Sequence, residues 1–362
     1  MDPDRNYVSY SDDVETIAPD EQETIDAIIA SMTHESQITA ERYQHAVRAS
    51  HAKSHGLLIG QLRVLGRLPE ALRQGLFATA RDYPVAVRLA VGPGELLSDA
   101  VSTHRGMAIK VFDVDGPMLP GHEGAVTQDF VLASGPVFPQ PDAAGFLKSM
   151  KGLEKATEKS EGFKQAVSTA ARAANAVIAG SSSMLDFFGH PPLPPLADTY
   201  YSQAAIRYGD YIAKISVTPV TPALVAMQST KLDVKDDADA FRHSVQEFLR
   251  TQGAEFELRV QLCTDLGSMP VEDASKQWSE KHSPYVAVAR LILPPQEAYS
   301  PERKGYMDDV MSFRPGHGLQ AHRPLGSLMR ARLQTYPSLS ALRHQINKQV
   351  EHEPRGLDEI PA

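Results

Sequence analysis

The sequence has almost no cysteine, no long apolar run and no excess of basic residues. Cys263 is the only thiol in 362 residues, so an intrachain disulfide is impossible and no zinc or iron–sulfur site can be built from cysteines within one chain. Acidic residues outnumber basic ones by 45 to 36, which gives a formal net charge of −9. Because duplex binding depends on clustered lysine and arginine, this balance argues against nucleic acid as the main partner.

Membrane and export signals are missing as well. No stretch approaches the roughly 18 consecutive apolar residues that a membrane helix needs. The polar, acidic N-terminus lacks the apolar core of a secretory signal. We therefore expect no integral membrane segment and a cytoplasmic location. The remaining composition, 42% hydrophobic and 22% charged, is ordinary for a globular protein with a sizeable core.

Hydrophobic patterning divides the chain into a polar N-terminal arm at 1–18, a single domain at 19–350 and a polar C-terminal tail at 351–362. Within the domain, apolar residues spaced i, i+3, i+4 and i+7 predict an amphipathic helix over 19–33. Further helices are expected near 237–250 and from beyond Pro324 to about Val350.

A helical insertion is predicted at 143–188, where Ala, Lys and Glu are frequent. Apolar positions there lie beside Lys148, Lys151, Lys155 and Lys164. We interpret the insertion as helices packed on the rest of the domain with a solvated basic face. A flap over an amphipathic substrate or a membrane surface is the alternative.

Short runs rich in Val, Leu and Ile, broken by Gly and Pro, predict strands. The predicted strands are Leu57–Val64, Val85–Val91, Met107–Val114, Phe130–Ala133, Ile212–Thr218, Phe256–Cys263 and Tyr285–Leu293. In the sixth of these, apolar and polar residues alternate, which is typical of a strand with one buried face. The pattern favours an α+β protein with an antiparallel barrel or large sheet over βαβ units.

Three separated segments carry residue types with chemical potential. The first contains Arg48, Ser50, His51 and Lys53. The second is Arg88 followed by the run Arg105-Gly-Met-Ala-Ile-Lys110. The third is Arg332-Leu-Gln-Thr-Tyr336-Pro, with Arg343 further on.

The third segment places a cation beside a phenol. Arg332 and Tyr336 are four residues apart, so they share one face of a helix. A guanidinium favours the phenolate, and a tyrosinate is a known axial ligand of haem iron. Taken alone, a surface helix with a solvated Arg332 is the simpler interpretation, and one histidine among 13 is weak evidence for catalysis.

Taken together and in this order, the segments resemble the haem catalases over roughly residues 40–345, the span of a large domain. Arg323-Pro-Leu-Gly326 resembles the smaller, catalase-like branch. The resemblance implies an antiparallel β-barrel of the catalase type with helical insertions packed outside. It also implies a haem b (heme b) with ferric iron, held by Tyr336 as the metal ligand.

The resemblance implies a role for each matching residue. Arg332 would keep the tyrosine anionic, and His51 would handle the peroxide proton. The predicted haem-binding residues are Arg48, Arg88, Arg343, Tyr336 and the aromatic residues Phe130 and Phe138.

The sequence departs from the catalase pattern on the distal side. Counting back from Phe138 puts Ala125 where catalases have an asparagine, and a shift of a few residues would bring Thr127 or Gln128 there. Ala90 replaces a hydroxyl residue that supports the distal histidine. On the proximal side, Ser338 replaces an aspartate.

Ser50, which precedes the histidine, is the other departure, because catalases have an apolar residue there. Allene oxide synthases of the catalase-like type carry a hydroxyl at this position, which favours an organic hydroperoxide or a peroxidase co-substrate. The alternative is a hydroxyl that only satisfies a nearby backbone group.

The sequence thus predicts a haem-dependent peroxidase-type enzyme that uses hydrogen peroxide or an organic hydroperoxide, with an electron donor as a further substrate. A fatty-acid hydroperoxide isomerase or lyase, a true catalase and a homo-oligomeric assembly stay open. His51 argues against a simple haem carrier, which has no need of an acid–base group.

Overall fold

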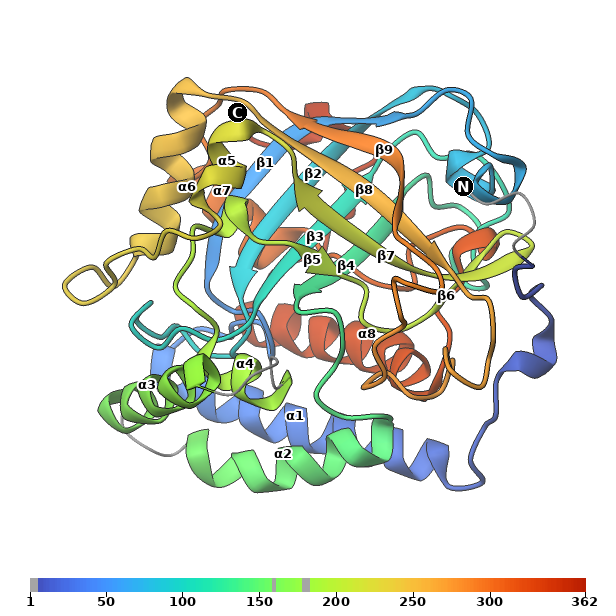
Figure 1. Ribbon diagram of the computed structural model, residues 1–362. Coiled ribbons are helices and arrows are strands. Elements are labelled where there is room, and N and C mark those ends of the chain that lie inside the picture. The colour runs from blue at the N-terminus through green and yellow to red at the C-terminus, as the bar shows by residue number, and fades with distance from the viewer. Residues whose placement is uncertain (1–5, 158–160, 178–182) are drawn as a thin grey trace.

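The computed structural model describes residues 6–157, 161–177 and 183–362. Its centre is one antiparallel sheet with the strand order β5-β4-β3-β2-β1-β9-β8-β7-β6. The sheet closes into a barrel because β5 pairs with β4 on one side and with β7 on the other (Figure 1). The strands are β1 (Ser54–Val64), β2 (Asp82–Val91), β3 (Arg105–Val111), β4 (Gln128–Ser134), β5 (Tyr200–Tyr201), β6 (Ile206–Tyr208), β7 (Tyr211–Pro219), β8 (Ala254–Leu262) and β9 (Val286–Leu293).

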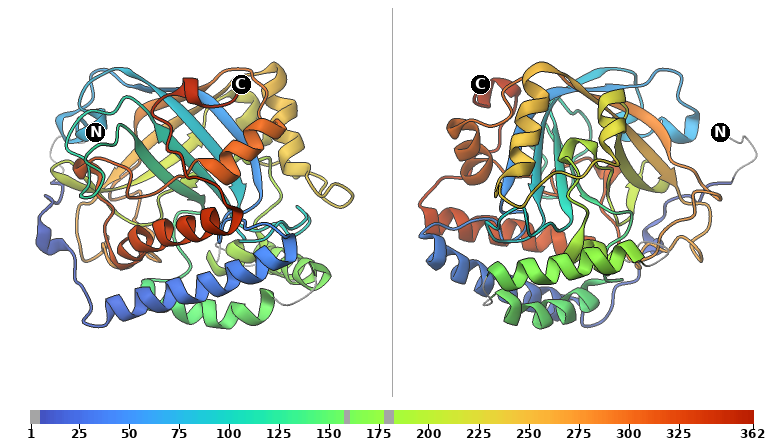
Figure 2. Two further views of the ribbon diagram at one scale, coloured as in Figure 1. Left: turned by 180° about the vertical axis from the view of Figure 1, so that it is seen from behind. Right: turned by 60° about the vertical axis from the view of Figure 1, so that its left-hand side comes forward.

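Helices cover the outside of the barrel, which confirms the predicted α+β barrel architecture. They are α1 (Glu21–Tyr43), α2 (Ala143–Thr157), α3 (Glu161–Val177), α4 (Ser183–Gly189), α5 (Pro222–Met227), α6 (Ala240–Thr251), α7 (Pro301–Gly305) and α8 (Ser327–Asn347). A π-helical turn, Tyr306–Val310, follows α7 directly. Helix α1 lies against both α8 and α2, and the three form a layer on one side of the barrel (Figure 2).

The two faces of β2 show how the barrel wall serves both a core and a site. Val85, Val87 and Leu89 belong to the large apolar cluster inside the barrel. Successive side chains of a strand point to opposite faces, so Arg88 and Ala90 lie on the outer face. On β3 the same alternation places Ala108 outside. This outer face of small and basic side chains faces the helical layer.

The predicted strands are confirmed within a few residues, but β5 and β6 are absent from the prediction, because elements of two or three residues show no periodicity. Helix α1 continues ten residues beyond the predicted end at position 33. Its later buried residues are Ser36, Thr39 and Ala40, which carry no hydrophobic signal. Helix α8 begins at Ser327 and not at Pro324, since Pro324 instead forms a β-bridge with Ile206.

Both terminal segments are tied to the domain. The backbone amide of Val8 donates to the carbonyl of Cys263, and Glu15 forms an ion pair with Arg330. At the other end, Glu351 pairs with Arg314, and Ile360 joins an apolar cluster on the outer face of the barrel.

The predicted insertion forms α2, α3 and α4. Helix α2 packs on α1 and α8 and not directly on the barrel. Lys148 and Lys151 are exposed, whereas Lys164 pairs with Glu95 at 2.6 Å. The side chain of Lys155 lies outside the described residues.

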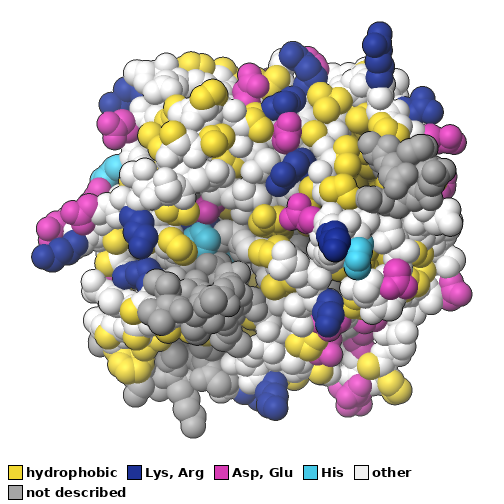
Figure 3. Space-filling model, in the orientation of Figure 1, with side chains coloured by type: hydrophobic (Ala, Val, Ile, Leu, Met, Phe, Trp, Pro, Cys, Tyr) yellow, Lys and Arg dark blue, Asp and Glu magenta, His cyan; other side chains and the backbone are white. Residues whose placement is uncertain are grey.

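Surface charge and helix length agree with the sequence. Basic and acidic side chains are interspersed over the face seen in Figure 3, without a continuous basic stripe. Among the described residues, no helix combines the length and the apolar character that crossing a bilayer requires.

A buried ion pair within the wall gives a stability prediction. The ammonium group of Lys110 on β3 lies 2.8 Å from both carboxylate oxygens of Asp129 on β4, and both side chains are fully buried. Asp129→Ala leaves the buried ammonium group of Lys110 with the partly exposed carboxylate of Glu353, at 3.0 Å, as its partner among the described residues. Losing the fully buried partner should still lower the free energy of unfolding, by up to about 3–5 kcal/mol. Urea denaturation of the purified variant measures this loss.

The exposed pair between Arg63 and Asp82, whose atoms are 3.0 Å apart, supplies the control. An exposed pair is worth about 0–1 kcal/mol, so Asp82→Ala should shift the urea midpoint only slightly. Equal losses in the two variants would contradict the assigned role of the buried pair.

Candidate functional site

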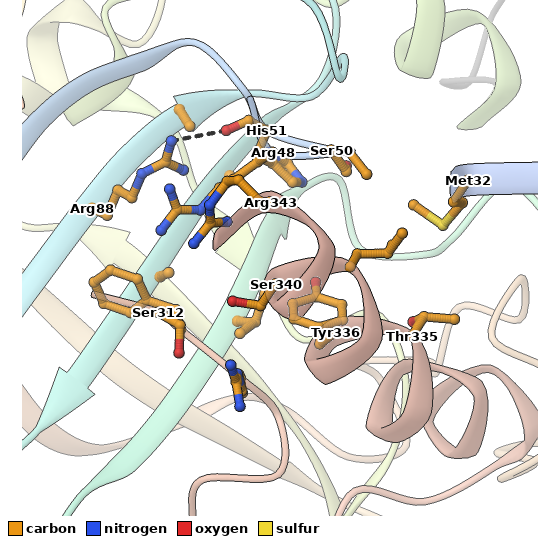
Figure 4. A pocket seen from close by; sticks show the side chains of 18 of the residues that line it. Met32, Arg48, Ser50, His51, Arg88, Ser312, Thr335, Tyr336, Ser340 and Arg343 are labelled. Atoms are coloured by element: carbon orange, nitrogen blue, oxygen red, sulfur yellow. Dashed lines mark hydrogen bonds between the residues drawn. The ribbon is translucent and has the colours of Figure 1, made fainter. Parts of the chain in front are cut away.

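A pocket with an empty volume of about 810 Å³ lies between the outer face of the barrel and helix α8. Its walls come from α1, the loop before β1, strands β2 to β4, the segment 312–314 and α8 (Figure 4). Arg48, Ser50, His51, Arg88, Tyr336 and Arg343 all line it, so the structure brings together residues that the sequence spreads over almost 300 positions.

His51 sits in a loop with an unusual backbone. Its φ of 55° lies in the left-handed region, which non-glycine residues rarely adopt and which recurs at functional sites. The conformation is held on two sides: the amide of His51 donates to the carbonyl of Gly92 at 2.8 Å, and Arg88 donates to the carbonyl of His51 at 2.9 Å. Ser50, the residue before the histidine, binds the same acceptor, because its hydroxyl donates to the Gly92 carbonyl at 3.1 Å.

The side chain of His51 is half-buried, and its surroundings favour the neutral imidazole. Desolvation lowers its pKa well below the ordinary value, and the nearby His104 and Arg88 lower it further. Its Nδ1 atom is shielded from solvent and has no hydrogen-bond partner among the described residues. A neutral imidazole at neutral pH is able to accept a proton.

Three arginines converge on one end of the pocket. Arg48 donates to the carbonyls of Asp308 and Met311, both at 2.9 Å, and Arg88 pairs with Asp308 at 3.1 Å. Burial lowers the pKa of Arg343 to about 10, and repulsion from Arg88 adds to this effect. The pKa of Arg48 is also lowered, again first by burial and then by the other two guanidinium groups.

Direct contacts leave part of this cluster unpaired. Among the described residues, the buried Nε atoms of Arg88 and Arg343 have no hydrogen-bond partner, and Asp308 pairs directly with Arg48 and Arg88. Guanidinium groups bind carboxylates through paired, charge-assisted hydrogen bonds. The cluster therefore fits a ligand that carries carboxylates, as the two propionates of haem do.

Tyr336 reaches the pocket from α8 together with Leu339, Ser340 and Arg343. These residues are spaced i, i+3, i+4 and i+7, so one face of the helix forms this wall. Arg332 lies one turn earlier and does not line the pocket. Its guanidinium sits 5.8 Å from the ring centre of Phe138 and donates to the sulfur of Met329 at 3.7 Å. Ser338 is turned away, with its hydroxyl bonded to the carbonyl of Gln334.

The structure corrects the predicted placement of Thr127 and Phe130. Strands β3 and β4 pair with Gly106 opposite Ala133 and Val111 opposite Gln128. Thr127 thus precedes the far end of β4, about 20 Å along the strand from the end near His51 at about 3.3 Å per residue. Gln128 is also committed elsewhere, because its side-chain oxygen accepts from the amide of Leu319.

Phe130 points into the barrel, where its ring stacks on Phe77 at 6.3 Å. Phe138 is buried against Phe146 beyond the pocket wall. The sequence prediction put Ala125 at the asparagine position by counting back from Phe138, but Ala125 precedes β4 and packs against the core inside the barrel. The β4 residue that lies nearest the histidine loop is Ala133, which pairs with Gly106.

Small and apolar residues form the barrel side of the pocket. Ala90, Gly106, Ala108 and Val131 line it there, and among the described lining residues there is no asparagine or glutamine. An amide that could orient a peroxide is therefore missing from the walls that the structure describes.

The sequence prediction missed two polar residues of this region, Asp308 and His104. Asp308 lies in a short π-helical turn without a recognisable motif. His104 immediately precedes the Arg105-Gly106 pair that was singled out, but one histidine beside a motif carries no signal of its own.

Sequence comparison found no matching family model and no matching curated protein. Solved structures do match. A bacterial catalase has a TM-score of 0.61 at 18% identity, with 86% of this chain and 60% of that chain covered. A fungal catalase has a TM-score of 0.58 at 15% identity, covering 85% and 63%. Catalase A from Saccharomyces cerevisiae gives 0.57 at 13% identity, covering 94% and 69%.

The chain therefore has the catalase fold. It spans less than two thirds of the length of the bacterial and fungal catalases that it matches. At these identities the likeness defines the fold, and the activity has to be argued from the site.

Proposed function

We propose that the protein is a haem-dependent, peroxide-using oxidoreductase of the catalase-related peroxidase type. The observation that carries the proposal is the convergence of Tyr336, His51 and the three arginines on one pocket. The motifs predicted these residues separately, and the three guanidinium groups offer the positive charge that haem propionates require. The catalase fold supports the same conclusion.

The residues of the pocket divide the work. When bound, haem b would supply ferric iron and the redox chemistry of peroxide. Tyr336 would hold the iron as a phenolate, and Arg332, one helical turn away, would favour that anion. Arg48, Arg88 and Arg343 would hold the propionates. Neutral His51 would accept a proton from the peroxide and return it to the departing oxygen, so that water leaves.

A fatty-acid hydroperoxide isomerase or lyase is the second candidate. The apolar barrel side of the pocket favours it, as does Ser50, whose side chain lines the pocket. The hydroxyl of Ser50 donates a hydrogen bond to the backbone carbonyl of Gly92, however, so a serine at this position can be explained without a substrate contact. Such an enzyme would consume the hydroperoxide without any added donor.

The pocket walls predict weak oxygen release from hydrogen peroxide and efficient oxidation of an added electron donor. Ala90 lines the pocket where catalases have a hydroxyl, and the described lining residues include no amide side chain that could orient a second peroxide as reductant. His51 and Tyr336 remain, so the first peroxide should still be cleaved. An oxygen electrode and a dye-oxidation assay on one haem-loaded preparation measure both activities.

The same preparation separates the alternatives. Consumption of an unsaturated fatty-acid hydroperoxide without donor would identify the isomerase or lyase. Vigorous oxygen evolution with negligible dye oxidation would contradict the peroxidase proposal and identify a true catalase.

A further inference from the structure

A second histidine, His104, lies directly against the ring of His51. The ring centres are 5.5 Å apart and the planes are nearly perpendicular, at 82°. The two residues are 53 positions apart in the sequence, one before β1 and the other before β3. No motif places a histidine at position 104.

One residue, Gly92, joins the backbones of the two histidines. The carbonyl of Gly92 accepts from the amide of His51, and the amide of Gly92 donates to the carbonyl of His104, both at 2.8 Å. The spacing of the two residues is therefore fixed by hydrogen bonds and does not depend on ring packing alone.

Two glycines make room for the two rings. A Cβ atom on Gly92 would lie 2.1 Å from the ring of His104, and one on Gly106 would lie 2.6 Å from Nδ1 of His51. Any larger residue at either position would displace a ring. The wall is thus shaped around a pair of imidazoles.

Helix α4 fixes the second ring. The ring of His104 stacks on Phe187 with centres 4.0 Å apart and an interplanar angle of 17°. Its Nδ1 atom lies 3.4 Å from the carbonyl of Phe187, and its backbone amide donates to the same oxygen. Because a carbonyl only accepts, Nδ1 carries the hydrogen in the neutral ring and Nε2 is left as the basic atom.

We propose that His104 is a positioning residue for His51, which sets the plane of the His51 ring and keeps it free of a proton. The helical insertion takes part through Phe187, which holds His104 in place. The proposal rests on the proposed function for its catalytic meaning, but the contact between the two rings does not.

Electrostatic repulsion explains how His104 would keep His51 unprotonated. Two imidazoles in contact disfavour a state in which both are protonated, so a proton on His104 keeps one away from His51. The other charged groups that act on His51 are Arg48 on its own loop, Arg88 on β2 and Arg332 on α8, and Tyr336 lines the same pocket. After burial, His104 lowers the pKa of His51 more than any of these arginines does, in keeping with the contact between the two rings.

His104→Phe tests the role, because phenylalanine keeps the stack on Phe187 and the contact with His51 but does not titrate. Deuterium exchange at the imidazole C2 atoms, resolved by mass spectrometry, reports the protonation midpoint of each histidine in the full-length protein. We expect the midpoint of His51 to move to higher pH in the variant. Phe187→Leu, which loosens the stack, should move it in the same direction by less.

A matched control and a kinetic readout complete the experiment. His243→Phe, at an exposed histidine of α6 paired with Asp237, should leave the midpoint of His51 unchanged. In stopped flow with hydrogen peroxide, His104→Phe should react as fast as the parent protein at neutral pH. As the solution is acidified, the rate constant of the variant should begin to fall at a higher pH than that of the parent protein. His104→Ala, which also loses the ring, should be slower at every pH.

The outcomes are distinct. An unchanged midpoint for His51 in His104→Phe would overturn the positioning role, whether or not haem is bound. A shifted midpoint in a protein that takes up no haem or fails to react with peroxide would uphold the ring coupling and overturn the proposed function.

Discussion

Tyr336→Phe should abolish the tyrosinate absorption of the ferric haem and remove most of the bound cofactor. Tyr336 is the α8 residue of the pocket with an oxygen able to become anionic, and it lines the pocket together with the three arginines. Phenylalanine fills nearly the same space but offers the iron no ligand atom. Loss of a group that merely supports a metal ligand already costs about 10–100-fold in affinity, so loss of the ligand itself should cost more.

The measurement is haem content per chain with the Soret and charge-transfer bands of the purified variant. Tyr306→Phe is the matched control, because the hydroxyl of Tyr306 is buried without a hydrogen-bond partner and its removal leaves the packing intact. That control should load haem normally. An unchanged spectrum and haem content in Tyr336→Phe would show that another group holds the iron.

The arginine cluster explains why the tyrosine variant should retain a fraction of its haem. Arg48, Arg88 and Arg343 would still attract the propionates after the axial bond is lost. Asp308 complicates this attraction, since it already pairs with Arg88 at 3.1 Å. Its carboxylate orients the guanidinium and neutralises part of the charge, so the cluster attracts two propionates less strongly than three isolated cations would.

The sequence predicted those features that depend on regular spacing or on a motif. Alternation of apolar residues located the long strands, and the Arg332–Tyr336 spacing placed both on α8. The motifs singled out Arg48, His51, Arg88 and Arg343, and all four line one pocket, because each motif is short and sits next to a strand or within a helix whose register is fixed. The roles of these residues stay predictions.

The failures come from register and from contacts between distant segments. Thr127 and Phe130 were placed by a count along the chain, and neither lines the pocket. Such a count does not show which face of β4 a side chain occupies, and a shift of one residue turns a side chain to the other face of the sheet. His104 was missed because its meaning depends on Gly92, Gly106 and Phe187. Those partners come from β2, β3 and α4, and only the folded barrel brings them together.

His51→Ala should retain haem and react with hydrogen peroxide about 10²–10⁴-fold more slowly, which is the typical worth of general acid–base catalysis. Haem should stay bound because the proposed ligand and the three arginines lie on other elements. Stopped-flow decay of the ferric Soret band after mixing with peroxide gives the rate constant. His243→Ala, at the exposed histidine on α6, should react like the parent protein.

The backbone of His51 calls for a second variant. Its φ of 55° is costly for alanine but is more readily adopted by asparagine. His51→Asn should therefore preserve the loop that Arg88 and Gly92 hold, while its amide offers no base of comparable strength. We expect both variants to react equally slowly. If the asparagine variant reacts fast and the alanine variant slowly, loop structure and not proton transfer sets the rate.

The pH dependence gives an independent check on His51. Burial, His104 and Arg88 hold the pKa of His51 well below the ordinary histidine value of about 6.5. A lowered pKa means that the neutral, proton-accepting form persists as pH falls through that value, so the rate constant should stay level there and decline only in more acidic solution. The His51 variants should lack this acid-side decline because the group that titrates is gone. A parent rate constant that already halves near the ordinary histidine pKa would show that His51 is not held neutral by its neighbours, or that a different base accepts the proton.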